Sequence, residues 1–317
     1  MMAQLNQQHT RDLIECLPQV RGTYEAGFDL SKITWFRVGG PAEVMFRPAD
    51  VDDLASFLAR KPVDVPVSLV VGVGSNLLIR DGGVPGVVIR LGREMGSINA
   101  RGTDVRAGAG AMDIHVARAA MKAGIEGLEF LNGIPGTIGG SLRMNAGAYG
   151  AEMKDVFVEA EAVDRSGTKH RLSATDMGFG YRSCAVSAEW IFTSVCVRGR
   201  RGLSEDIERR MQHIRSERET TQPTRFATGG STFKNPEGAR AWELIEQAGC
   251  RGLRRGGAVV SEKHCNFLIN AGDASAADLE GLGEEVRRRV ADVTGVELEW
   301  EIRRIGIAAP AVGKETP

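Results

Sequence analysis

Two glycine-rich segments contain the groups best suited to hold an anion. The first, GVGSNL at 72–77, follows an apolar run and is followed by the strand-like LLIRD. Its backbone N–H groups, with one hydroxyl and one side-chain amide, would form a concave donor site for phosphate; a plain hairpin turn accounts for the segment equally well. A dinucleotide fingerprint is disfavoured because the third glycine position holds leucine. The candidate residues are Gly72, Gly74, Ser75, Asn76 and Leu77.

The second segment, GIPGTIGGSLRMNAGAYG at 133–150, is longer and richer in glycine. Loops of more than about 12–15 residues are usually functional, and unhindered N–H donors suit a pyrophosphate held from two sides. No Walker lysine follows, so a site for a triphosphate with magnesium is not expected. The candidate donors are Gly136, Thr137, Gly139, Gly140, Ser141, Asn145 and Gly147.

A third segment, GGSTFKNP at 229–236, presents Ser231 on a glycine turn. It lacks the GxSxG arrangement and an evident histidine–carboxylate pair, so Ser231 is better suited to giving a proton than to attacking a substrate. A capping serine is an equally good interpretation. The five histidines, His264 among them, show no metal-ligand spacing, and we expect no metal site.

Composition indicates a cytoplasmic, enzyme-sized protein. The 317 residues include 40 Lys and Arg against 41 Asp and Glu, so no global charge favours nucleic acid or an anionic membrane. Five scattered cysteines without a CxxC pair indicate a reducing compartment. Neither a signal peptide nor an apolar stretch of about 20 residues is evident.

Hydrophobic patterns predict the elements that would position these segments. Strands are predicted at 67–71, 77–79, 86–91, 104–108, 156–164, 191–198, 267–270 and 297–305. Helices are predicted at 51–61, 112–123, 203–220, 239–248 and 276–294, with the run Arg287–Arg289 on a solvated, salt-bridged face. Domain boundaries are placed near 92 and 202.

Taken in order, eight motifs resemble the UDP-N-acetylenolpyruvoylglucosamine reductase (MurB) family. They are FRVGGPAE (36–43), GVGSNLLIRDGGVPGVVI (72–89), EFLNGIPGTIGGSLRMNAGAYG (129–150), FGYR (179–182), TQP (221–223), GGSTFKNP (229–236), GGAVVSEKHCNFLIN (256–270) and LEWEIRRIG (298–306). The short link after FGYR resembles type II members.

The resemblance implies an α+β fold in three parts. Residues 1–92 and 93–202 would form a two-subdomain FAD-binding fold of the PCMH, or vanillyl-alcohol-oxidase, type. Residues 203–317 would form a C-terminal α/β domain that binds substrate and carries the catalytic glutamate on its last strand.

The resemblance also implies the chemistry. Non-covalent FAD, reduced by NADPH, would reduce the enolpyruvyl group of UDP-N-acetylglucosamine enolpyruvate to give UDP-N-acetylmuramate, a peptidoglycan precursor. The enzyme would be a UDP-N-acetylmuramate dehydrogenase that acts as a monomer, without nucleic acid or membrane partners. The 72–77 and 133–147 loops would hold the FAD pyrophosphate.

Individual roles follow from the matching positions. Arg182 and Glu301 would polarise the substrate carboxylate, and Ser231 would protonate the adjacent carbon. Glu299 is the alternative glutamate; Glu301 is chosen because it precedes an aliphatic residue and an arginine. The remaining matches are a flavin contact, Arg218, and the substrate contacts Lys234, Asn235 and His264.

This chain departs from the family at two positions. Cys184 replaces the serine two residues after the arginine, and Thr221 replaces a basic residue, which leaves Arg225 or Arg251 to contact the diphosphate. Two other readings remain: a different FAD oxidoreductase of the same fold, and a flavin- or nucleotide-binding module without chemistry.

Overall fold

The computed structural model describes residues 10–309, and these form two compact units. The first unit holds the described residues up to Glu25, with Met45–Val73 and Val88–Thr220. The second holds Ala26–Val44, Gly74–Val87 and the described residues from Thr221 onward. Helices and mostly antiparallel sheets occur in both, which confirms the α+β class. The boundaries near 92 and 202 remain predictions.

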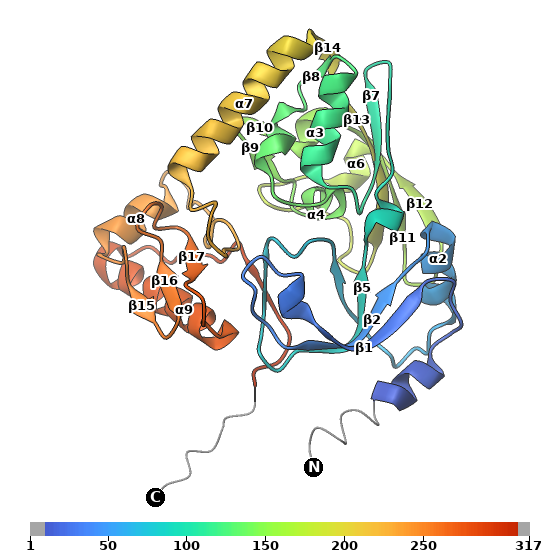
Figure 1. Ribbon diagram of the computed structural model, residues 1–317, viewed down its shortest axis with the longest axis horizontal. Coiled ribbons are helices and arrows are strands. Elements are labelled where there is room, and N and C mark those ends of the chain that lie inside the picture. The colour runs from blue at the N-terminus through green and yellow to red at the C-terminus, as the bar shows by residue number, and fades with distance from the viewer. Residues whose placement is uncertain (1–9, 310–317) are drawn as a thin grey trace, which may run out of the picture. The chain divides into compact units, whose positions relative to one another are not determined.

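A five-stranded antiparallel sheet, in the order β12-β11-β13-β7-β6, is the main sheet of the first unit. Helices α3 (Asp113–Lys122) and α4 (Ile138–Arg143) pack against it (Figure 1). Because α4 is part of the glycine-rich segment 133–150, the sheet packs directly against that segment. The strands are β6 (Ile98–Arg101), β7 (Asp104–Gly108), β11 (Phe157–Val163), β12 (Lys169–Leu172) and β13 (Ile191–Arg198).

Ten smaller elements and the long helix α7 complete the described part of the first unit. They are α2 (Val51–Arg60), β3 (Val67–Val71), η2 (Arg93–Met95), β8 (Ile125–Glu126), η3 (Glu129–Gly133), β9 (Gly147–Ala148), β10 (Ala151–Glu152), α5 (Met153–Val156), α6 (Ala174–Met177), β14 (Arg200–Arg201) and α7 (Ser204–Thr221). Another sheet has the order β1-β2-β5-β3, with β1 at Thr23–Asp29, β2 at Pro41–Arg47 and β5 at Val84–Arg90; of its strands, only β3 lies wholly in the first unit.

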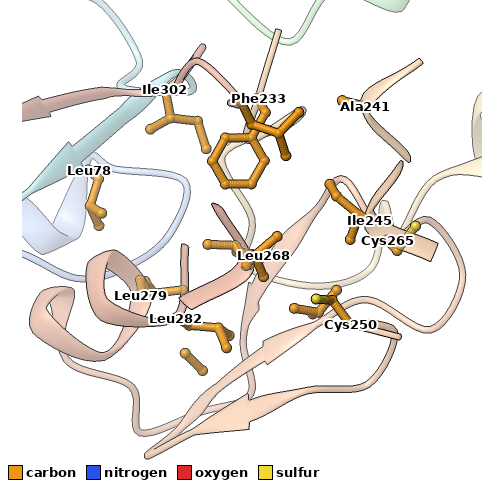
Figure 2. Packing of buried hydrophobic residues seen from close by; sticks show 14 of the residues in the cluster. Leu78, Phe233, Ala241, Ile245, Cys250, Cys265, Leu268, Leu279, Leu282 and Ile302 are labelled. Atoms are coloured by element: carbon orange, nitrogen blue, oxygen red, sulfur yellow. The ribbon is translucent and has the colours of Figure 1, made fainter. Parts of the chain in front are cut away.

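The second unit is built around one apolar cluster. Phe233, Leu268, Leu279 and Ile302 are almost fully buried in it (Figure 2). It lies between the sheet β15-β16-β17 and the helices α8 and α9, and the parallel pair β4 and β18 joins its edge. The elements are η1 (Leu30–Lys32), β4 (Leu77–Ile79), α8 (Ala241–Gln247), β15 (Arg254–Arg255), β16 (Ala258–Val260), β17 (Leu268–Asn270), α9 (Ala276–Thr294) and β18 (Arg303–Ile305).

Most predicted elements are present. The ranges 67–71, 77–79, 104–108, 191–198 and 276–294 have the predicted bounds, and Arg287 and Arg288 form ion pairs on α9. The long strand predicted at 297–305 is wrong, because only Arg303–Ile305 is a strand. The segment changes partners along its length: the Glu299 carbonyl accepts from the Lys234 N–H, whereas the Arg303 N–H donates to the Asn76 carbonyl.

Helix α9 begins at a carboxylate from another part of the second unit. Asp81 accepts the N–H groups of Ala276 and Ala277, each at 2.9 Å, in addition to the local Ser275 cap. Two otherwise unpaired donors of the first turn are satisfied there, beside the positive end of the helix dipole.

Removing this carboxylate should destabilise the second unit. We expect Asp81→Ala to lower the free energy of unfolding by about 1–2 kcal/mol, because both N–H groups lose their acceptor. Urea denaturation measures this free energy of unfolding. The control is Asp292→Ala on the same helix, which loses only an exposed ion pair with Arg288 and should change stability by less than about 0.5 kcal/mol. Equal effects of the two substitutions would contradict the assignment.

Candidate active site

The two glycine-rich segments touch each other in the first unit. A Cβ added at Gly72 would lie 2.1 Å from the Thr137 Oγ1, so only glycine permits this approach. At Gly136 a Cβ would lie 2.8 Å from the Asp113 Oδ2, whereas at Gly140 it would meet no atom within 4 Å. Gly72 and Gly136 therefore serve packing, and Gly140 leaves space beside the backbone.

The other end of the 72–77 loop belongs to the second unit. Gly74 has φ +61°, and its carbonyl accepts from the Trp35 N–H. Leu77 is buried in β4 and pairs in register with Arg303, while Ser75 is half-buried. The Asn76 side chain donates to the Glu301 carbonyl at 3.1 Å. Asn76, which the sequence predicts to contact phosphate, thus also holds the segment that carries Glu301.

Asn145 links the second glycine-rich segment to the turn that carries Arg182. Its Nδ2 donates to the Glu152 carboxylate at 2.9 Å and to the Gly180 carbonyl at 3.1 Å. Backbone hydrogen bonds join Gly180 and Ser183 around Arg182. Asn145 and Arg182 have φ of +40° and +52°, a conformation that side chains rarely adopt without support. Glu152, which carries no motif signal in the sequence, completes this support through its hydrogen bond with Asn145.

Three further predicted residues of the first unit have protein contacts. Gly139 donates its N–H to the Ala109 carbonyl, and Gly147 lies in β9 against Glu152. Arg218, on α7, is half-buried, and this burial lowers the pKa of its guanidinium while the nearby Tyr149 raises it.

Cys184, which stands where the resemblance implies a serine, accepts from the Arg143 guanidinium at 3.7 Å, so it contacts an arginine other than Arg182.

In the second unit, Ser231 and Glu301 come from neighbouring backbone segments. The Glu301 N–H donates to the Thr232 carbonyl at 2.8 Å, one residue after Ser231. On its other side Ser231 bridges Phe267, whose ring lies 4.8 Å from that of His264. The three candidate residues Ser231, His264 and Glu301 are thus held by one local network.

The remaining predicted residues of this unit are engaged by neighbouring groups. Lys234 pairs with the carboxylate of Glu299 at 3.1 Å, and the Asn235 side chain accepts from the Ala241 N–H at the start of α8. Burial lowers the pKa of His264, and within residues 10–309 its buried Nδ1 has no hydrogen-bond partner. A neutral imidazole with an unused nitrogen is suited to a substrate hydrogen bond at neutral pH.

Arg251, one of the two basic residues considered for the diphosphate, pairs with Glu246 and donates to the Glu262 carbonyl. In the described part of the chain, no three His, Cys, Asp or Glu side chains are grouped as metal ligands would be. Nor does any helix between residues 10 and 309 have the length and apolar character needed to span a membrane.

Known proteins resemble this chain over nearly its whole length. Residues 222–305 match the C-terminal domain of UDP-N-acetylenolpyruvoylglucosamine reductase, and residues 42–173 match an FAD binding domain. The UDP-N-acetylenolpyruvoylglucosamine reductase of Parvibaculum lavamentivorans is 62% identical over 94% of this chain and 96% of its own. That of Paramagnetospirillum magneticum is 59% identical over 95% and 97%. The crystal structure of the MurB enzyme from Thermus caldophilus matches with a TM-score of 0.77 and 34% identity, covering 91% of this chain and all of that one.

The contact between Gly72 and Thr137 can be tested by stability. We expect Gly72→Ala to lower the free energy of unfolding by about 1–3 kcal/mol, because the new methyl group overlaps the Thr137 side chain. Adding Thr137→Ala should recover part of that loss. Thermal unfolding measures both.

Gly140→Ala is the matched control, because the open space around this helical glycine predicts unchanged or slightly higher stability. If Gly140→Ala destabilised the protein as much as Gly72→Ala, the distinction between packing and open glycines would be wrong.

Proposed function

The chain belongs to the UDP-N-acetylenolpyruvoylglucosamine reductase family, and from this premise we propose which of its residues carry out the reaction. It is an FAD-dependent oxidoreductase that reduces UDP-N-acetylenolpyruvoylglucosamine to a peptidoglycan precursor. NADPH is the proposed electron donor, and we propose a monomeric, cytoplasmic enzyme divided near residues 92 and 202.

The loops at 72–77 and 133–147, with Arg218, are the proposed contacts of FAD. The glycine positions support this assignment, because the space beside Gly140 lets a pyrophosphate approach the backbone and a Cβ would fill it. When bound, FAD supplies the hydride that adds to the terminal methylene carbon of the enolpyruvyl group. Donors from the protein backbone suit the anionic pyrophosphate.

Three side chains are assigned to the substrate. Arg182 and Glu301 polarise the enolpyruvyl carboxylate, which makes the terminal methylene electrophilic. Ser231 donates its hydroxyl proton to the carbon beside the carboxylate, where enolate character develops. A fixed serine can act as this acid because the developing carbanion is strongly basic. Lys234, Asn235 and His264 are the proposed contacts to the rest of the substrate.

One observation carries the pairing of Ser231 with Glu301. The Glu301 N–H donates to the Thr232 carbonyl at 2.8 Å, and its carbonyl accepts from the Asn76 side chain at 3.1 Å. The glutamate backbone is thus fixed on both sides, next to the residue that follows Ser231. Glu299, the alternative glutamate, forms an ion pair with Lys234 instead.

Anaerobic stopped-flow absorbance tests the two half-reactions. Mixing the protein with NADPH should bleach the flavin absorbance, and adding UDP-N-acetylglucosamine enolpyruvate should restore it. Recovery should require that sugar. Bleaching without recovery would indicate another oxidoreductase of this fold, and folded protein unable to take up FAD would contradict the cofactor site.

The role of Ser231 is tested by Ser231→Ala. We expect this variant to bind FAD and be reduced by NADPH at the normal rate, while reoxidation by the enolpyruvyl substrate slows by about 10²–10⁴-fold. The exposed helical Ser216→Ala is the control and should turn over normally. Unchanged reoxidation in Ser231→Ala would remove Ser231 from the mechanism.

A further inference from the structure

Asp113, the first residue of α3, lies fully buried under the second glycine-rich segment, with 0% exposure. The Ser141 hydroxyl is 2.9 Å from its Oδ2, and the Asp113 N–H donates to the Gly136 carbonyl at 3.2 Å. Its second oxygen, Oδ1, is buried and has no hydrogen-bond partner within the described chain. The carboxyl group thus touches the segment proposed to hold the FAD diphosphate.

An ionised carboxylate is poorly accommodated in this position. A buried anion needs several hydrogen bonds or a cation, and here one hydroxyl faces it. Burial accordingly raises the pKa of Asp113 to about 7, while the Ser141 hydrogen bond lowers it. The α3 N-terminus also favours the ionised form.

Charged groups on the surrounding elements are directed elsewhere. His115 and Arg118 of α3 are exposed, and Arg106 of β7 pairs with Glu159. Glu129 of η3 pairs with Arg210, and Arg143 of α4 donates to three backbone carbonyls, those of Val186, Ser187 and Trp190.

The strands β6 and β13 bring no charge to Asp113 either. On β6, Arg101 is exposed, and on β13, Arg198 pairs with Asp104. The protonation of Asp113 is therefore governed chiefly by its burial and by Ser141.

Protonation decides where the Ser141 proton points. An ionised Asp113 can only accept, so it takes the Ser141 proton. A neutral Asp113 can donate its own proton to the Ser141 oxygen, which leaves the serine hydroxyl able to donate to another acceptor. Oxygens of a diphosphate beside this segment are such acceptors.

We propose that Asp113 acts as a buried neutral acid that turns the Ser141 hydroxyl toward the flavin diphosphate and so couples FAD binding to the protonation of this pair. Asp113 is a positioning residue that acts through Ser141. The inference rests on the proposed function, since it requires FAD at the glycine-rich segment.

FAD titrations between pH 6 and pH 8.5 test the coupling. With apo protein and flavin fluorescence as the signal, the wild-type Kd should rise about tenfold over this range. Asp113 loses its proton as pH passes about 7, takes the Ser141 hydrogen bond and places a negative charge near the diphosphate. Asp113→Asn cannot ionise, and its amide still donates to Ser141. Its Kd should be nearly constant with pH and close to the wild-type value at pH 6.

Ser141→Ala separates the hydrogen bond from simple charge repulsion. It should bind FAD more weakly than wild type at pH 6 and show a smaller dependence on pH, and adding Asp113→Asn should remove the remainder. Thermal unfolding shows whether each variant is folded. If Asp113→Asn does not fold, the pH dependence of FAD binding in Ser141→Ala tests the proposal.

Three outcomes would count against these ideas. The same pH dependence in wild type and Asp113→Asn would overturn the role of Asp113. The full wild-type dependence in Ser141→Ala would overturn the relay through serine. Folded wild type that fails to bind FAD at every pH would instead contradict the proposed function.

Discussion

The structure depends on fixing a glycine-rich backbone that has few side chains to anchor it. Glycine leaves N–H groups accessible but loses much conformational freedom on folding. The first unit meets this constraint with close backbone approach at Gly72 and Gly136 and with the buried polar side chains of Asp113 and Asn145. These anchors lie away from Gly140, where an added Cβ would meet no atom within 4 Å, so the space beside that glycine stays open.

In the second unit, hydrogen bonds to the backbone hold the candidate residues in place. Segment 299–303 passes from the 232–234 backbone to Asn76, and each exchange of partner fixes one more residue around Glu301. Helix α9 adds side-chain support: Glu284 accepts from the Trp300 indole at 2.8 Å and pairs with Arg304 at 2.6 Å. Ile302 of this segment and Phe233, which bridges Trp300 of the segment, are both buried in the apolar cluster. The backbone of Glu301, the proposed catalytic glutamate, is thus held on both sides.

Several predicted site residues have structural contacts as well. Asn76 and Asn145 each use their amides within their own unit, one on Glu301 and the other on Glu152 and Gly180. Asn235 caps α8 in the same way. An amide offers both donors and an acceptor, so one side chain can shape a loop and leave the surrounding backbone available to a ligand. Motif residues therefore include anchors of the site in addition to its contact groups.

The sequence by itself determined the long periodic elements, the glycine-rich segments and the family, because hydrophobic period, turn residues and motif order are local properties of the chain. It also selected Ser231 and Glu301 through family resemblance. Only the tertiary structure decided that 297–302 is not a strand, because the segment changes its hydrogen-bond partners from the 232–234 backbone to Asn76 and so forms no continuous ladder. Asp113 could not be selected from the sequence either: an acidic residue at a helix start ordinarily indicates a solvated first turn, and only packing against Gly136 and Ser141 buries it.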